Sequence, residues 1–176
     1  PEAARLAISI CDAESRCADA AYFLSRGLGV AKDDVRATEA LQRGCENDDF
    51  PSCTELGIRY REGRGQSKDP HRAVELFRKA CDGADATACD MLSQAYATAE
   101  GVPRDLTKAF ALARAACDTD GVEGCASVGI MTADGKGTPK DVDAALPYLS
   151  FACRRAVQPA CAKLLALGKP LPELDM

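Results

Sequence analysis

The chain has 176 residues, of which 47% are hydrophobic and 28% charged, and its formal net charge is −5 with a pI near 5.0. These values are typical of a folded protein, and the length suits one domain or one repeat array. No long basic run is present, and no apolar stretch is long enough to cross a bilayer. We therefore expect neither nucleic acid nor membrane insertion.

The chain contains ten cysteines, an even and high number that favours an oxidising compartment. We therefore expect a periplasmic, cell-surface or secreted protein, and the alanine- and arginine-rich composition suggests a bacterial one. The sequence opens with PEAARLAIS and shows no signal peptide, which we interpret as a trimmed or mature form.

The first predicted element is a helix over residues 2–11, and a 36-residue repeat follows it. The full repeats are 17–52, 53–88, 89–124 and 125–160. Each opens with a cysteine, and twelve residues later comes a glycine: Gly29, Gly65, Gly101 and Gly137. Sixteen residues after the cysteine comes an aspartate, and four residues later an alanine: Asp33, Asp69, Asp105 and Asp141, then Ala37, Ala73, Ala109 and Ala145.

Each repeat predicts two helices. In CTELGIRYREG the apolar or small residues recur at offsets 0, 3, 4 and 7, which is the stripe of an amphipathic helix. The glycines that follow suit a left-handed helix stop, and the aspartate suits the N-cap of the second helix, such as RAVELFRKAC. Small residues at offsets 4 and 20, such as Gly57 and Ala73, let the two helices approach closely.

The last predicted helix covers residues 161–168 and matches a first helix. The array is therefore one domain over residues 1–168: half a repeat (1–16), four full repeats and half a repeat (161–168). The proline-rich tail, 169–176, is expected to be extended or frayed. The predicted fold class is all-α, an αα-hairpin repeat solenoid.

The pattern LG..Y..G.G...D...A, with its 36-residue period, resembles the Sel-one-like repeat (SLR) family, relatives of the tetratricopeptide repeats. The paired cysteines narrow the likeness to a disulfide-bridged branch, the Helicobacter cysteine-rich proteins. The resemblance covers residues 2–168 and implies a right-handed superhelix. Three features depart from the pattern: Ala20 and Ala21 replace leucine and glycine, Thr132 replaces tyrosine, and the first cysteine pair is two residues closer together.

Each cysteine pair joins the end of a second helix to the start of the next first helix, which is within disulfide reach. We predict sequential bridges: Cys11–Cys17, Cys45–Cys53, Cys81–Cys89, Cys117–Cys125 and Cys153–Cys161. Zinc is the alternative, but structural zinc sites use closely spaced ligands, whereas seven residues separate the cysteines of most pairs and His71 is the single histidine. We therefore expect no metal ligands and no cofactor.

Signatures of catalysis are weak. GKGT at 135–138 lacks the order of a phosphate loop and belongs to the repeat turn, and His71 suits a solvated first helical turn. Some members of the resembling branch are credited with penicillin binding or β-lactamase activity, yet the chain has no SxxK and no KTG. We expect no enzyme and no catalytic residue, with β-lactam or cell-wall-precursor binding or hydrolysis as an alternative.

Offsets 2, 5, 6 and 9 of each first helix point away from the packing stripe. The resemblance implies that this face is concave, and its mixture of apolar, aromatic and charged residues is typical of interfaces. Packing against the adjacent repeat is the alternative. The candidate partner-binding residues are Asp19, Tyr22, Phe23, Arg26, Glu55, Ile58, Arg59, Glu62, Met91, Gln94, Thr98, Ser127, Ile130, Met131 and Asp134.

The leading functional hypothesis is a non-enzymatic scaffold or adaptor that holds a protein or peptide ligand on the concave face. The resemblance also leaves open an immunity protein against a secreted bacterial toxin, or an assembly factor of the mitochondrial intermembrane space. The half-repeats at the two ends are shaped to receive a neighbour, but we expect a monomer.

Overall fold

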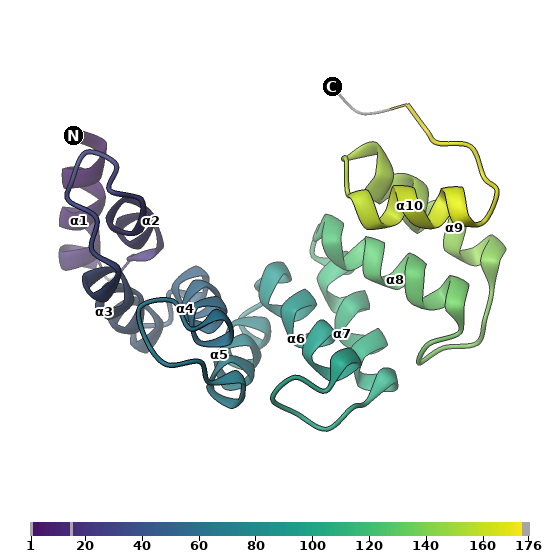
Figure 1. The fold of residues 1–176 in the computed structure, drawn as a ribbon, viewed down its shortest axis with the longest axis horizontal. Coiled ribbons are helices and arrows are strands. Elements are labelled where there is room, and N and C mark those ends of the chain that lie inside the picture. The colour runs from purple at the N-terminus through teal and green to yellow at the C-terminus, as the bar shows by residue number, and fades with distance from the viewer. Residues whose placement is uncertain (1, 15, 174–176) are drawn as a thin grey trace. The chain divides into compact units, whose positions relative to one another are not determined.

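The computed structural model describes residues 2–14 and 16–173, with the side chains of residues 12 and 14 left aside, and the described residues form helices without strands (Figure 1). The last three residues of the predicted tail lie outside the described part. None of the helices described is both long and apolar enough to traverse a bilayer. The helices are α1 (Glu2–Glu14), α2 (Ala18–Arg26), α3 (Asp34–Glu46), α4 (Phe50–Glu62), α5 (Pro70–Asp82), α6 (Ala86–Thr98), α7 (Leu106–Asp118), α8 (Val122–Asp134), α9 (Val142–Arg154) and α10 (Gln158–Ala166).

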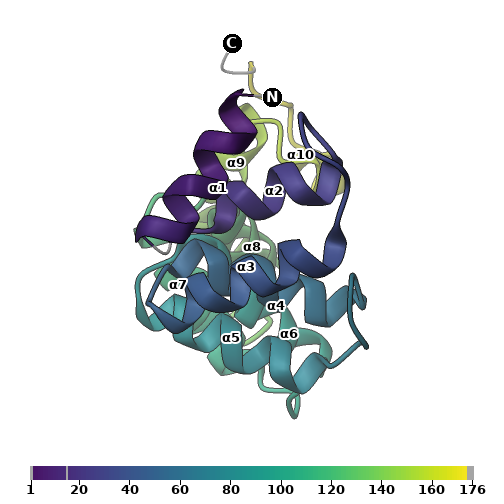
Figure 2. The same cartoon turned by 90° about the vertical axis from the view of Figure 1, so that its left-hand side faces the viewer.

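The helices divide between two compact units, Pro1–Gly83 and Ala84–Met176. In unit 1, α2 packs on α3 and α4 packs on α5, while α1 lies against α2 (Figure 2). In unit 2, α6 packs on α7 and α8 on α9, while α10 lies against α8 and α9. Each predicted repeat is thus one pair of packed helices, which confirms the all-α class and the helix-pair repeat.

The recurring aspartates cap the second helices as the sequence predicts. Each carboxylate accepts a hydrogen bond from the backbone N–H three residues later, at 2.9–3.0 Å. An aspartate placed there satisfies an otherwise unpaired amide and lies at the positive end of the helix dipole. The capping residues are Asp33, Asp69, Asp105 and Asp141.

The repeat glycines lie in the turns between paired helices and have positive φ angles of 73–75°. A residue with a Cβ is strained in this conformation, which explains why glycine recurs there. Two residues earlier, the C-caps of the first helices of the four full repeats are also left-handed. Here α6 differs from the others because Ala99 (φ 63°) takes the place of glycine.

Small residues allow the paired helices to approach closely. A Cβ added to Gly57 on α4 would lie 2.6 Å from the Phe77 ring on α5, and one added to Gly129 on α8 would lie 2.8 Å from Leu149 on α9. The alanines at offset 20, from Ala37 to Ala145, are 0–1% exposed. The close approach predicted from glycine and alanine is confirmed.

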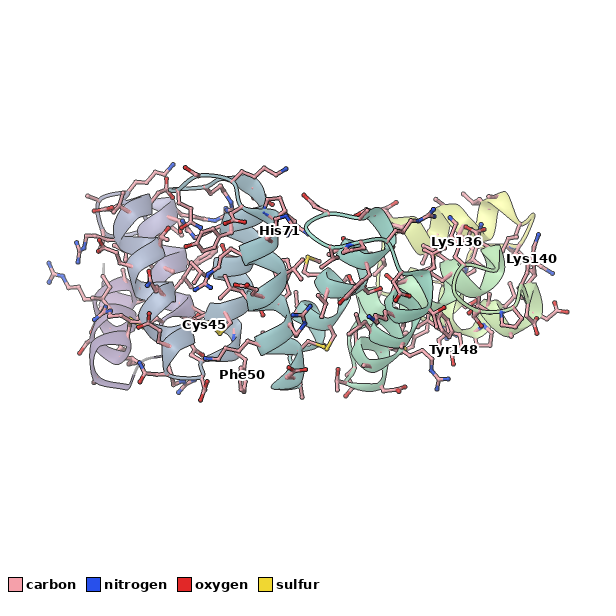
Figure 3. The ribbon with its side chains drawn as sticks, turned by 90° about the horizontal axis from the view of Figure 1, so that it is seen from below. Cys45, Phe50, His71, Lys136, Lys140 and Tyr148 are labelled. Carbon is pink, nitrogen blue, oxygen red and sulfur yellow. A yellow bond between two sulfur atoms is a disulfide. The ribbon has the colours of Figure 1, made fainter. Side chains whose placement is uncertain are left out.

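Disulfides join one helix pair to the next. Four bridges have Cα–Cα distances of 4.4–4.8 Å: Cys11–Cys17, Cys45–Cys53, Cys117–Cys125 and Cys153–Cys161. Cys81 and Cys89 are disulfide-bonded as well, and the described residues include no free cysteine. Figure 3 labels Cys45, at the C-terminal end of α3. The predicted staples at the repeat junctions are confirmed.

The predicted start of the first helices is wrong by three residues, almost one helical turn. We predicted that these helices begin at their cysteines, but α4, α6, α8 and α10 each begin three residues before the cysteine. The residue before each start is the N-cap, and in α6 the Asp85 carboxylate accepts from the backbone N–H of Ala88 at 2.8 Å. Helix α1 likewise continues three residues past Cys11. Most of the bridges therefore connect a last helical turn to a first helical turn.

Candidate functional site

A groove of about 720 Å³ lies on the first helices of unit 1. Its volume is in the range of protein ligand sites. Four of the predicted partner-binding residues line it: Asp19, Tyr22, Arg26 and Glu55. The other lining residues are Ala18, Ser25, Lys32, Asp34, Pro51, Arg64 and Gly65. The groove therefore combines part of the predicted face with residues from helix ends and turns.

Tyr22 is the aromatic side chain of the groove. It is 51% exposed, and its ring meets Phe23 edge to face with centroids 5.8 Å apart. The Arg26 guanidinium lies 5.2 Å from the Tyr22 ring centroid, which is a cation–π distance. Within the described part of the chain, Arg26 makes no ion pair. A rigid aromatic ring beside an arginine is the side-chain combination that dominates binding energy in many interfaces.

Arg59 holds the groove together from beneath, although the sequence analysis placed it on the binding face. Its side chain is 1% exposed. Nη1 donates to the Thr38 hydroxyl at 3.4 Å and to the Asp34 carbonyl at 3.5 Å, and Nη2 donates to Ser25. The Asp34 and Glu55 carboxylates each lie 3.7 Å from the guanidinium. Arg59 therefore braces α4 against α2 and α3 and is not available to a partner.

The charges along the groove largely balance one another. Lys32 pairs with Asp34 at 3.3 Å, and Arg64 lies 3.5 Å from Glu55 and 2.7 Å from Glu62. Such a groove has no strong preference for a polyanion or a polycation. It suits a polar ligand that carries both signs of charge, as a peptide does.

Lys32, Asp34 and Arg64 line the groove but lie outside the exposed face of the first helices, from which the partner-binding residues were predicted. Lys32 and Arg64 belong to the turns that follow these helices, and Asp34 opens α3. Their place on the groove depends on how the turn folds back over α2 and α4. The periodic pattern carries no signal for that.

Several of the candidate partner-binding residues of unit 2 pack against other helices of that unit. Met131 is 7% exposed and packs in a core cluster with Ala109, Ala113 and Val128, so it is removed from the candidate set. Ile130 packs against the core cluster of α8, α9 and α10. Gln94 and Thr98 are exposed, while Met91, Ser127 and, in unit 1, Ile58 are half-buried. Packing against neighbouring helices, which was the alternative to partner binding, therefore explains why Met131 and Ile130 are apolar.

Asp134 and two lysines form a charged cluster in unit 2. The carboxylate lies 3.0 Å from the Lys136 ammonium and is hydrogen-bonded to Lys163 on α10. These hydrogen bonds, Lys163 first, lower the pKa of Asp134 below its ordinary value of 3.8. The pairing joins the end of α8 to α10, so a structural role competes with partner binding at this residue.

Asp90 is a buried carboxyl group that the sequence analysis did not single out. It is 2% exposed, and it accepts hydrogen bonds from Gln94 at 2.7 Å and from Ser127 at 2.8 Å. Burial raises the pKa of Asp90, and these two hydrogen bonds oppose that shift. The sequence held one signal: the other repeats have Ala18, Thr54 and Ala126 at this offset. The bond to Ser127 links α6 to α8.

No group of three or more histidine, cysteine, aspartate or glutamate residues converges anywhere in the described residues. The cysteines are consumed by disulfides and so cannot coordinate zinc as thiolates. His71 is exposed in the first turn of α5, as expected, and is labelled in Figure 3.

Comparison with known proteins places the chain in a familiar context. A family model described as Sel1 repeat matches residues 12–49, 51–85, 86–118 and 122–157. No curated protein sequence is similar enough to count as a match.

Solved structures with the same helix-pair fold come from several bacteria. The crystal structure of a Sel1 repeat protein from Oxalobacter formigenes is 22% identical, with a TM-score of 0.79 over 98% of this chain and 77% of that one. A protective antigen of uropathogenic Escherichia coli with an SLR fold is 23% identical, with a TM-score of 0.82 over 97% of this chain and 37% of that one. Cysteine-rich protein B of Helicobacter pylori is 26% identical, with a TM-score of 0.59 over 76% of this chain and 96% of that one.

Proposed function

Because the chain belongs to the Sel1 repeat family, whose repeats serve as protein-interaction scaffolds, we propose that it is a non-enzymatic scaffold that binds a protein or peptide in the groove of unit 1. The observation that carries the proposal is the exposed Tyr22–Arg26 pair in a groove of about 720 Å³. The pair supplies an aromatic contact surface and a cation without an ion-pair partner among the described residues.

Rigidity of the groove supports the same proposal. Arg59 ties the groove-lining residues Ser25, Asp34 and Glu55 to one another from beneath. The Cys45–Cys53 bridge fixes α3 to α4 in the same unit. A site that is ordered before the ligand arrives loses less conformational entropy on binding, which favours affinity.

We further propose that the protein works in an oxidising compartment: the periplasm, the cell surface or the surrounding medium. All ten cysteines are disulfide-bonded. Reducing compartments keep thiols reduced, so a fold with a bridge at each repeat junction is suited to oxidising surroundings. The similarity to a Helicobacter cysteine-rich protein supports this placement.

The test is a capture experiment followed by an affinity measurement. Oxidised wild-type protein, a Tyr22→Ala/Arg26→Ala variant and a Tyr148→Ala variant are used as baits on native extract. Tyr148 is a matched control because it is also a partly exposed tyrosine, 36% exposed, and it lies on α9 in the other unit. A partner identified with the wild type is then titrated against all three proteins by calorimetry.

We expect the double variant to lose at least about tenfold in affinity, as for a central interface pair, and the Tyr148→Ala variant to bind like the wild type. Equal affinity of the wild type and the double variant would show that the partner binds elsewhere. A chromogenic β-lactam assay on the same samples tests the hydrolase alternative, and turnover above the buffer blank would contradict the scaffold proposal.

A further inference from the structure

The Tyr22–Arg26 pair occurs in one repeat only. Tyr22 and Arg26 lie five and nine residues after the opening cysteine of the first full repeat. At the same two offsets the later repeats have Ile58 and Glu62, Gln94 and Thr98, and Ile130 and Asp134. A packing role common to all repeats would place similar residues there. The pair therefore indicates a role that is specific to the groove of unit 1.

The Arg26 guanidinium keeps its hydrogen-bond donors available. The side chain is exposed, and its interaction with the described residues is the contact with the Tyr22 ring, whose centroid lies 5.2 Å away. This attraction comes from the charge distribution of the ring and uses no conventional hydrogen-bond acceptor. A guanidinium carries five N–H donors in a fixed planar fork. These donors can therefore bind an acceptor that a ligand brings into the groove.

The other cations along the groove already have anionic partners. Lys32 lies 3.3 Å from the Asp34 carboxylate, and Arg64 lies 3.5 Å from the Glu55 carboxylate. A new anion would have to compete with these carboxylates for Lys32 or Arg64. At Arg26 it would meet no such competition from the described residues, so a negative group of a ligand is drawn to Arg26 first.

We propose that Arg26 anchors a single carboxylate of the bound peptide, supplied by the side chain of an internal aspartate or glutamate. An apolar residue next to it in the peptide packs against the exposed part of the Tyr22 ring. This inference rests on the groove function proposed above and names the chemistry of the ligand.

The groove favours a carboxylate over a phosphate. The two oxygens of a carboxylate match two parallel N–H groups of the guanidinium fork, which gives a bidentate pair. A phosphate monoester carries about two negative charges near neutral pH and is commonly bound by clusters of arginines. Here one arginine stands without an ion pair among the described residues, and the lining also includes the carboxylates of Asp19, Asp34 and Glu55. These carboxylates repel a second negative charge more than they repel the first.

The lining residues indicate an internal acidic residue as the source of the carboxylate. Ala18 and Asp19 lie about two helical turns before Arg26 on α2, and Lys32 lies in the turn that follows α2. The groove therefore continues in both directions from the Tyr22–Arg26 pair. A peptide chain can extend past Arg26 on both sides, whereas a chain end held at Arg26 would leave one side of the groove unused.

The probes are acetylated hexapeptides that differ in the charged group. The first is Ala-Ala-Asp-Phe-Ala-Ala with an amidated C-terminus, and two analogues carry asparagine or phosphoserine in place of the aspartate. The fourth, Ala-Ala-Ala-Ala-Asn-Phe, has a free C-terminal carboxylate. Each is titrated into the oxidised full chain, and binding is followed by the NMR signals of the Arg26 Nε–H group and the Tyr22 ring.

The key variant is Arg26→Lys, which keeps the positive charge but loses the planar fork. The matched control is Arg155→Lys, because Arg155 also lies over an aromatic ring, 4.0 Å from the Phe151 centroid, but in unit 2. We expect the wild type to bind the aspartyl peptide at least about tenfold more tightly than the asparaginyl peptide, and more tightly than the other two. Arg26→Lys should weaken the aspartyl peptide at least about fivefold, while Arg155→Lys binds it like the wild type. Circular dichroism checks that both variants are folded.

Several results would overturn the inference. Equal binding of the aspartyl and asparaginyl peptides, unchanged binding by Arg26→Lys, or no shift at tens of millimolar peptide would show that Arg26 holds no carboxylate. Tighter binding of the phosphoseryl peptide, or of the peptide with the free C-terminus, would identify a phosphate or a chain end as the ligand instead.

The capture experiment separates this inference from the groove function. A captured partner that loses affinity for Tyr22→Ala/Arg26→Ala but binds Arg26→Lys like the wild type would leave the groove function in place and would refute the carboxylate anchor. A partner that binds the double variant as tightly as the wild type would contradict the groove function itself.

Discussion

A substitution at the C-cap of α6 tests how much a left-handed backbone conformation lowers the stability of this repeat. Ala99 has a φ of 63°, whereas the equivalent residues of the other repeats are glycines with φ of 66–75°. The left-handed conformation costs an L-residue about 1–2 kcal/mol, and glycine loses roughly 0.5–1 kcal/mol more entropy on folding than alanine does. We therefore expect Ala99→Gly to raise the free energy of unfolding by about 0.5–1 kcal/mol.

The opposite substitution at the same position of another repeat is the control. In Gly63→Ala, the new Cβ has its nearest contact at 3.4 Å, on Lys68, so the effect comes from the backbone alone. We expect a loss of about 1 kcal/mol, which corresponds to roughly 2–4 °C in melting temperature for a chain of this size.

Urea unfolding without reductant, followed by far-UV circular dichroism, measures both variants under conditions that keep the disulfides intact. A decrease in stability for Ala99→Gly would refute the reasoning, because it would mean that the alanine methyl group contributes more than its backbone strain costs.

Three further predictions concern stability. Burial raises the folded-state pKa of Asp90 above its ordinary value of 3.8. The free energy of unfolding that the protonated carboxyl contributes is therefore fully present below pH 3.8 and is lost as the pH rises through the folded-state pKa. Asp90→Asn is expected to remove this loss, and urea midpoints between pH 3 and 8 that decline equally in both proteins would contradict the prediction. Arg59→Ala is expected to cost about 2–4 kcal/mol, since it removes a buried guanidinium that joins three helices, and thermal melting beside an Arg61→Ala control measures it. Cys45→Ser/Cys53→Ser is expected to lose about 2–3 kcal/mol from the entropy of a short closed loop; addition of reductant should then destabilise the wild type more than the variant, and equal losses would count against a stabilising bridge.

The features that recur in the sequence are the ones it predicted well. Asp69 caps α5, Gly65 has the positive φ of the turn, and Cys45 bonds to Cys53, all as expected. Each of these features depends on residues within a few positions along the chain. Local hydrogen bonding and backbone conformation therefore decide them in every repeat alike, and a periodic pattern is enough to reveal them.

The roles of the face residues were harder to predict. Arg59 and Tyr22 occupy the same type of surface in the sequence pattern, but Arg59 is buried and Tyr22 is exposed. The difference arises because Ser25, Asp34 and Thr38 of the preceding repeat supply hydrogen-bond partners for a guanidinium. The burial of Asp90 depends in the same way on Ser127, one repeat further along.

By itself, the sequence determined the period, the helix pairs, the caps and the cysteine pairs, because each comes from short-range chemistry repeated every 36 residues. Tertiary structure alone decided which residues line the groove and where a buried charge finds its partners. The physical reason is that burial depends on side-chain sizes and polar groups in the neighbouring helices. A pattern of offsets within one repeat carries no information about those neighbours.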